Sequence, residues 1–233
     1  MTTPLLSTPI LFNAAQLRFN QALTSQITSL ANEAFMRSKS PDWDKWDNTR
    51  VRFPTVESYL DMLDAKTIVA LIFDRNAQSF DSVSNGVHER ERKKKEQGKV
   101  IACAAAVPWK GGWKKEGAET EDGWEIKAVC IDGDVRYLKK GLAVQVMKAL
   151  EDELVVRVKE QRSSRFTNGV KNGSVDGKGS VTLWILTAEC INGAYWRRRG
   201  YREIRRSREG DGTWGCKTSF DLVVFSKDVE YEV

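Results

Sequence analysis

The chain has 233 residues, a net charge of +5, and a composition that is 41% hydrophobic and 30% charged. These values are typical of a soluble globular protein with a buried core, and we predict one domain over residues 1–233. No apolar run reaches the roughly eighteen residues of a membrane-spanning helix, and no basic segment precedes Arg18 as a secretory leader would require. We therefore predict a cytoplasmic protein that contacts no membrane, with a nuclear location left open.

Cysteine and histidine are sparse and scattered along the chain. Cys103, Cys130, Cys190 and Cys216 form no C-x-x-C pair, and His88 is the only histidine. We interpret the cysteines as reduced structural thiols of an intracellular protein, with Cys190 the exception to watch because it lies near the predicted site. A lone histidine rules out a histidine-based cluster, so we predict no metal site.

The first third of the chain predicts a strand followed by helices. Residues 8–19 are interpreted as a strand and its exit, and Thr55 caps a short helix further on. Between them, Asn20 to Arg37 predicts a longer helix, because apolar residues recur on one side of it: Leu23, Ile27, Leu30, Ala31, Ala34 and Phe35.

An acidic and aromatic loop lies between these two helices, at residues 40–55. Its carboxylates would attract a cationic amine, and the faces of Trp43 and Trp46 would hold it by cation–π contact. The interpretation that we favour is simpler: the tryptophans anchor a surface loop to the core, and the aspartates are solvated. The aspartates concerned are Asp42, Asp44 and Asp47.

Two long polar segments interrupt the predicted strands. Residues 66–74 and 100–109 are expected to form two paired, buried strands, with a run of mixed charge from Glu89 to Lys99 in the segment between them. We interpret that run as solvated, and a nuclear-import or nucleic-acid patch is the alternative. Residues 162–180 are rich in Gly, Ser, Asn and Lys. We predict mobile insertions at about 76–98 and 162–180.

The segment from Trp124 to Ala143 predicts a strand, a turn and the start of a helix. Alternating residues form the strand to Ile131, and Asp132, Gly133 and Asp134 favour a bend. The helix runs on to about Gln161, with Ala143, Met147, Leu150, Leu154 and Val158 on its apolar face. A Lys-Lys-Gly turn that leads into a helix offers free backbone N–H groups and two ammonium groups, so we predict a phosphate site there.

A second strand–helix–strand unit follows at Val181 to Ile204. A buried strand over 181–187 is followed by a short helix at about Asn192 to Arg199 and by a strand from Tyr201. A last strand is predicted at 218–225.

At these two segments the chain resembles the GNAT superfamily of acyl-CoA-dependent N-acyltransferases. The pyrophosphate loop of that family reads Gln or Arg, two residues, Gly, one residue, and Gly or Ala, and the chain matches it except at Leu138. The second family motif is matched by Asn192 to Trp196 and by Gly200-Tyr201. The resemblance implies an α/β (α+β) fold with a mixed, mostly antiparallel central sheet whose central strands splay apart, flanked by helices.

The resemblance also implies roles for individual residues. Acetyl-CoA would be the donor. Asn192 would hold its pantetheine arm, and Trp196 and Arg199 would also contact the cofactor. Backbone N–H groups near Val129, Cys130 and Ile131 would polarise the thioester carbonyl. The loop that takes the pyrophosphate would be formed by Leu138, Lys139, Lys140, Gly141, Leu142 and Ala143.

Two catalytic side chains follow from the same resemblance. Glu125 would deprotonate the amine, with Glu189 in reserve, because an alkyl amine is mostly protonated at pH 7. The alternative is that Glu125 is a surface residue or forms a salt bridge with the nearby Lys127. Trp196 occupies the place of the usual thiolate-protonating tyrosine, so we assign that role to the adjacent Tyr195, although one residue is about 100° around a helix.

The predicted function is therefore the transfer of an acetyl group from acetyl-CoA to a primary amine, of a small molecule or of a protein, by direct attack. A non-catalytic acyl-CoA-binding homologue is the first alternative. A module that binds nucleic acid or an acidic protein through the arginines of residues 197–208 is the second. The sequence leaves the acceptor open, and it leaves the protein either a monomer or a homodimer.

Overall fold

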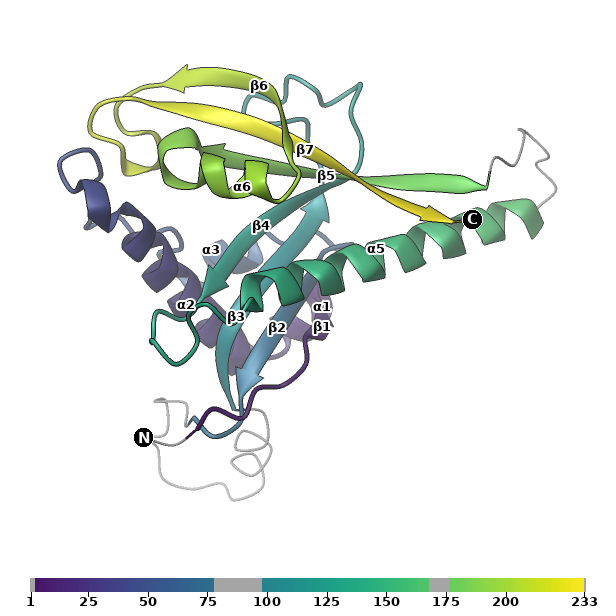
Figure 1. Ribbon diagram of the computed structural model, residues 1–233, viewed down its shortest axis with the longest axis horizontal. Helices are drawn as coiled ribbons and strands as arrows, with labels where there is room; N and C mark the ends of the chain where they lie inside the picture. The colour runs from purple at the N-terminus through teal and green to yellow at the C-terminus, as the bar shows by residue number, and fades with distance from the viewer. Residues whose placement is uncertain (1–2, 78–97, 168–176, 233) are drawn as a thin grey trace.

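The structure, a computed structural model, describes residues 3–77, 98–167 and 177–232. Within these ranges seven strands form one sheet in the order β1-β2-β3-β4-β5-β7-β6 (Figure 1). Neighbouring strands are antiparallel except β4 and β5, which are parallel. The predicted mixed, mostly antiparallel sheet is thus confirmed. The strands are β1 (Ile10–Asn13), β2 (Ile68–Asp74), β3 (Lys99–Pro108), β4 (Trp124–Ile131), β5 (Lys178–Ala188), β6 (Arg202–Glu209) and β7 (Phe220–Glu232).

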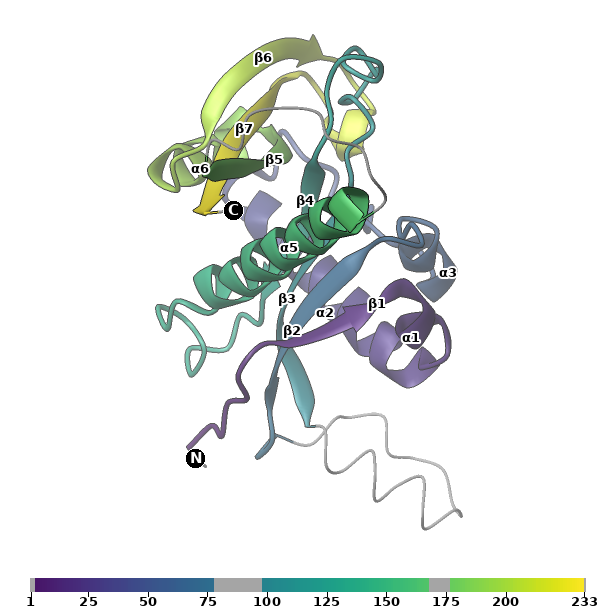
Figure 2. The same ribbon diagram turned by 90° about the vertical axis from the view of Figure 1, so that its right-hand side faces the viewer.

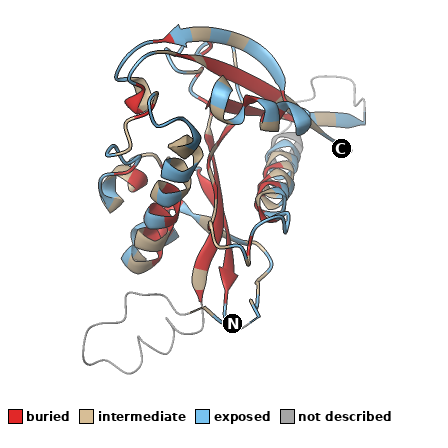
Figure 3. Ribbon diagram, turned by 60° about the vertical axis from the view of Figure 1, so that its left-hand side comes forward, coloured by how far each residue is buried: buried red, intermediate tan, exposed pale blue. Residues whose placement is uncertain are grey.

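Helices cover both faces of the sheet, as Figures 2 and 3 show. One face packs against the long helix α5 in a core that includes Val146, Leu150 and Leu154. The opposite face packs against the N-terminal helices through Leu17, Ile27 and other apolar side chains. The strands between the two helical layers are almost wholly buried. The helices are α1 (Ala14–Arg18), α2 (Gln21–Lys39), α3 (Val56–Leu60), α5 (Leu142–Thr167) and α6 (Ala194–Arg198).

The periodicity of α2 correctly predicted its buried face. Leu23, Ile27, Leu30 and Ala31 are buried, and Ala34 and Phe35 pack against the same core. The prediction for residues 8–19 missed one element, because a short helix, α1, follows β1 directly. Its N-terminus is closed by a capping box, in which the Asn13 side chain accepts from the Gln16 amide and the Gln16 side chain accepts from the Asn13 amide.

Several boundaries differ from the predictions. Helix α5 continues to Thr167 and β5 begins at Lys178, so the ordered elements extend into the predicted insertion at 162–180 from both ends. Strand β7 continues to Glu232, because its second half pairs with the first half of β5. The centres of both predicted insertions, including His88 and the mixed-charge run as far as residue 97, lie outside the described residues.

Strands β4 and β5 separate almost as soon as they meet. Their parallel pairing is limited to Trp124 with Leu183 and Glu125 with Trp184. On its other side β4 carries a bulge, because the register with β3 passes from Lys127 directly to Cys130 while β3 advances by only two residues. Such a bulge bends and twists a strand. The predicted splay of the central strands therefore has a visible cause, a bend in β4 that carries it away from β5.

The bulge is centred on Ala128, whose φ of 50° lies in the left-handed region. For a residue with a side chain this conformation costs about 1–2 kcal/mol, and such strain is often found at functional sites.

None of the helices in the described ranges combines the length and apolar character that a membrane span requires.

Candidate active site

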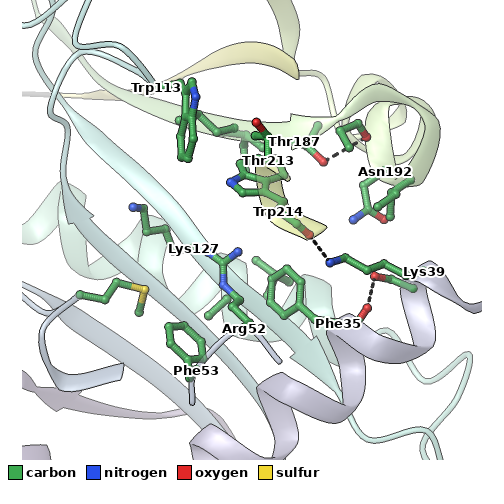
Figure 4. Close-up of a pocket in the computed structure, with 18 of the residues that line it drawn as sticks. Phe35, Lys39, Arg52, Phe53, Trp113, Lys127, Thr187, Asn192, Thr213 and Trp214 are labelled. Carbon is green, nitrogen blue, oxygen red and sulfur yellow. Dashed lines mark hydrogen bonds between the residues drawn. The ribbon is translucent and has the colours of Figure 1, made fainter. Parts of the chain in front are cut away.

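A cavity of about 750 Å³ opens where β4 and β5 part. One wall is formed by residues 126–129 of β4 and 185–188 of β5, the part of the two strands that lacks mutual pairing. The opposite wall comes from the end of α2, the irregular segment after residue 47, and the loops at 110–115 and 212–214. Figure 4 shows the side chains that converge on it. The parting of the sheet thus creates a space bordered by polar backbone.

Glu125 lies at the fork, in the last residue pair that joins β4 to β5. It lines the cavity, is only 8% exposed, and receives an ion pair from Lys127 with Nζ 3.1 Å from Oε2. Burial raises the pKa of the carboxyl above its ordinary value of 4.5, and the nearby charges of Lys127, Arg52 and Lys110 partly oppose that rise. A carboxylate with a raised pKa is a stronger base than a solvated one.

The three residues predicted to polarise a carbonyl separate into two groups. Val129 lines the cavity beside the bulge, where the backbone is not paired with β5. Cys130 is buried in the core on the α2 side of the sheet. The Ile131 carbonyl accepts a hydrogen bond from the Arg37 guanidinium at 2.5 Å. Among the three, Val129 is therefore the residue placed at the cavity.

The predicted pyrophosphate loop lies just beyond the end of β4, and none of its residues lines the large cavity. Lys139 and Gly141 have φ values of 59° and 70°, and α5 begins at the next residue, Leu142. The first N–H groups of a helix have no partner within it, and a Cβ built on Gly141 would meet nothing within 4 Å. The loop therefore offers open backbone donors and two exposed lysines at a helix N-terminus.

The turn before this loop is held by buried polar contacts. The Tyr137 hydroxyl donates to Asp74 Oδ2 at 2.8 Å, and Lys99 Nζ pairs with Asp132 Oδ2 at 2.6 Å. Hydrogen bonds from the Arg136 side chain and backbone lower the pKa of Asp134 to about 2. These contacts fix the conformation of the turn and thereby the position at which α5 begins.

The segment after β5 divides the second motif between two cavities. Asn192, in the π-helical turn Glu189–Gly193, and Trp196, in α6, line the large cavity. Tyr195 and Arg199 line a second space of about 300 Å³ between α5 and α6. The Tyr195 ring packs edge-on against Trp196, and its hydroxyl is buried with no hydrogen-bond partner. Trp196 thus stands between Tyr195 and the cavity that holds Glu125.

The reserve base, Glu189, is engaged elsewhere. Its carboxylate pairs with Arg197 at 2.5 Å and with Arg206 at 3.3 Å, and it does not line either cavity. Cys190 is exposed and likewise lines neither. Of the two predicted bases, Glu125 is the one at the parted strands.

The acidic and aromatic loop contributes less to the cavity than its composition suggested. Trp46 is buried against Phe220, which confirms the anchoring interpretation for this residue, whereas Trp43 is exposed, so the interpretation is wrong for it. Asp47 is the one aspartate of the loop that lines the cavity, and its carboxylate accepts from the Thr49 amide and hydroxyl.

Sequence reasoning missed a set of cations on the same cavity. Arg50 and Arg52 follow Asp47 in a segment without regular secondary structure, and this pair of arginines directly after the acidic loop was the available signal. The other basic residues that line the cavity come from separate elements: Lys39, Lys110, Lys115 and Lys127. Among the described residues, no group of His, Cys, Asp and Glu side chains is arranged to hold a metal ion.

No model of a known protein family matches the chain, and no curated protein matches it in sequence. Solved structures do. A candidate acetyltransferase from Acinetobacter baylyi ADP1 aligns with a TM-score of 0.53 at 12% identity, over 98% of this chain and 94% of that one.

Two further structures align at a lower level. NAA60 of Arabidopsis thaliana in complex with a bisubstrate analogue has a TM-score of 0.49 at 12% identity, over 95% of this chain and 99% of that one. An acetyltransferase of the GNAT family from Streptococcus pneumoniae gives the same four values. At such identities a likeness concerns the fold, and the alignment with the Acinetobacter protein is the one on which we rely. From that alignment and from the parted parallel strands of the mixed sheet, we conclude that the chain has the fold of the GNAT acetyltransferases.

Proposed function

We propose that the protein is an N-acetyltransferase that moves an acetyl group from acetyl-CoA to a primary amine. The observation that carries the proposal is Glu125, a buried carboxylate with a raised pKa at the fork of two parting parallel strands, facing a cavity of about 750 Å³. An amine with a pKa near 10 must lose a proton before it attacks. A raised carboxyl pKa brings the base closer to the operating pH, which favours proton transfer.

The donor would bind along the N-terminus of α5. In this proposal the ammonium groups of Lys139 and Lys140 and the amides of Gly141 to Ala143 take the pyrophosphate, with Leu138 contributing backbone only. Asn192, which lines the cavity, holds the pantetheine arm. Arg199, at the second cavity between α5 and α6, reaches the ribose phosphate. The reactive thioester then lies between the parted strands.

The reaction balances with the groups at hand. Glu125 takes the proton of the ammonium group and passes it to solvent, and the neutral amine nitrogen then attacks the thioester carbonyl carbon. A backbone N–H beside Val129 stabilises the oxygen that becomes negative, and the carboxylate of Glu125 takes the second proton from the nitrogen. The C–S bond then breaks, the amide forms, and coenzyme A leaves as a thiolate. With a thiol pKa near 8.5, that thiolate is a tolerable leaving group without an acid.

Protonation of the thiolate by Tyr195 stays a prediction. Because the Tyr195 side chain lies in the second cavity with its hydroxyl buried, this role would require the ring to rotate past Trp196. The proposal does not depend on it.

The arginine-rich alternative is less well supported. Five arginines of residues 197–208 form ion pairs with carboxylates on the same surface, which leaves less free charge for a nucleic acid or an acidic protein. The five are Arg197, Arg202, Arg205, Arg206 and Arg208.

The first test is the melting temperature with and without acetyl-CoA. A ligand at a hundredfold excess over its dissociation constant adds about 2.7 kcal/mol, which raises the melting temperature of a domain of this size by roughly 5–10 °C. Lys139→Glu with Lys140→Glu should weaken acetyl-CoA about tenfold or more. The matched control is Lys66→Glu with Lys178→Glu, the same charge change at exposed sites far from the loop.

The outcomes separate the candidates. A shift that the first double variant loses and the control keeps, followed by thiol release with an amine, supports the enzyme. A shift without turnover on any amine would point to the non-catalytic homologue. No shift at millimolar acetyl-CoA would overturn the donor site and the function with it.

A further inference from the structure

The cavity that holds Glu125 is strongly basic. Six basic residues line it, and only Asp47 and Glu125 oppose them. Both carboxylates already have partners, because Asp47 accepts from Thr49 and Glu125 pairs with Lys127. A protonated amine without other charges would therefore be repelled from this space.

The cations of the cavity differ in how they are engaged. Lys39 donates to the Trp214 carbonyl at 2.5 Å, and Arg50 donates to the Gly212 carbonyl at 2.8 Å, so both are tied to the loop at 212–214. The charges of Arg52 and Arg50 add to burial in lowering the pKa of Lys39, which indicates that the three are mutually repulsive.

Of the two arginines that line the cavity, Arg52 is the one whose side chain has no polar partner among the described residues. Its guanidinium forms no hydrogen bond or ion pair with any residue in the described parts of the chain, although it has five N–H donors. The ring of Phe35 lies 4.3 Å from its guanidinium carbon, and the ring of Phe53 lies 5.3 Å away. Stacking on these faces fixes the plane of the guanidinium and leaves its N–H edges open. Figure 4 shows Arg52 between Lys127 and Phe35, pointing into the cavity.

We propose that the amine acceptor carries a carboxylate, as an amino acid does, and that Arg52 binds it. A guanidinium matches the two oxygens of a carboxylate in a bidentate pair. The cavity volume of about 750 Å³ falls in the range of about 300–1,000 Å³ that is usual for small-molecule sites, and aromatic side chains line its remainder: Phe35, Phe53, Trp113 and Trp214. This inference rests on the proposed function and names its substrate class.

The cationic wall is separate from the predicted pyrophosphate loop. No residue of 138–143 lines the cavity, and its cations come from α2, the segment after Asp47, β4 and the loop at 110–115. The charge on this wall is therefore left for the acceptor once the phosphates of the donor are bound at α5.

Matched pairs of amines test the proposal. Phenylalanine is compared with 2-phenylethylamine, and leucine with 3-methylbutylamine, because the members of each pair differ only in the carboxylate. A third pair, O-phosphoethanolamine and ethanolamine, tests phosphate as the anion. Turnover is measured as thiol release from acetyl-CoA, and acceptor binding as a melting-temperature shift in the presence of coenzyme A.

The wild-type protein should prefer the carboxylated member by about 10- to 100-fold in kcat/KM, the range of one hydrogen-bonded charge pair. Arg52→Gln should reduce that ratio toward one, mainly through KM, while the shift given by acetyl-CoA stays. Arg202→Gln, which removes an arginine whose side chain is 69% exposed and paired with Asp228, should leave the ratio unchanged.

Failure of this inference and failure of the proposed function give different results. Turnover of the decarboxylated amines at equal or higher efficiency, or a preference that survives Arg52→Gln, would contradict binding of an acceptor carboxylate by Arg52. The proposal that the protein is an N-acetyltransferase would stand. A preference for O-phosphoethanolamine would replace the carboxylate by a phosphate. If no amine is turned over, the melting-temperature shift in the presence of coenzyme A tests the carboxylate instead. Equal shifts for both members of each pair would contradict the proposal.

Discussion

Arg52, in the cavity, and Arg205, on β6, carry the same charge in opposite surroundings. Arg205 pairs with Glu121 at 2.5 Å and with Glu116 at 2.8 Å, and these hydrogen bonds raise its pKa. Arg52 has aromatic neighbours and no carboxylate partner in the described chain. The net charge of +5 is therefore a poor guide to function. What distinguishes a binding arginine from a structural one is whether the protein itself satisfies it.

The largest expected effect comes from comparing a glutamate of the cavity with a glutamate of β6. Glu125→Gln keeps the shape of the side chain and removes the base, so kcat/KM should fall about 10²- to 10⁴-fold while acetyl-CoA binding persists. Glu203→Gln removes a carboxylate that pairs with Arg197 and Arg206 on β6, away from both cavities, and should leave kcat/KM unchanged. Steady-state kinetics with a turned-over amine measure both. An active Glu125→Gln protein would remove Glu125 from the mechanism.

The stability of two methionine variants should change in opposite directions. Arg205→Met leaves Glu116 and Glu121 without their partner, which should lower the free energy of unfolding by about 2 kcal/mol. Arg52→Met removes an unpaired charge that repels Lys39, so the free energy of unfolding should rise, by up to about 1 kcal/mol after the lost cation–π contacts. Urea denaturation of both variants measures the signs. A destabilised Arg52→Met protein would mean that Arg52 supports the fold rather than a ligand.

Much of the fold could be predicted from local sequence patterns. The spacing of Leu23, Ile27 and Leu30 defined the buried face of α2, and the two motif segments placed the strand–turn–helix units correctly. These features depend on residues close together in the chain, so their periodicity is visible. The capping box of α1, from Asn13 to Gln16, was a readable local signal that the prediction overlooked.

The cavity could not be predicted in the same way. Its bulge lies at Ala128, where no glycine marks the left-handed conformation, and it depends on pairing with β3. Its cations meet only after separate loops fold together. The direction of Tyr195 follows from packing against Trp196, which residue spacing along a short helix does not determine. Sites built from long-range contacts leave little trace in a single sequence.

The smallest expected effect is a displacement of the pH profile, and it compares Arg52 of the cavity with an arginine of β6. A general base must be deprotonated, so kcat/KM falls as the pH drops through the pKa of Glu125. Burial places that pKa above 4.5, and the charges of Lys127, Arg52 and Lys110 lower it in that order of size. Removing any of them raises the pKa of Glu125, which moves the acid limb of the profile to higher pH.

The shift should be larger for Lys127→Met than for Arg52→Gln, and smallest for Lys110→Gln. Arg202→Gln changes an exposed ion pair on β6 and should leave the limb in place. The measurement is kcat/KM against pH for each variant with one acceptor, because the ionisation of the free amine is then common to all. If the acid limb stays fixed in Arg52→Gln, or moves to lower pH, the charge of Arg52 does not lower the pKa of Glu125. Arg52 would then have no electrostatic effect on the base, and its contrast with Arg205 would not bear on catalysis.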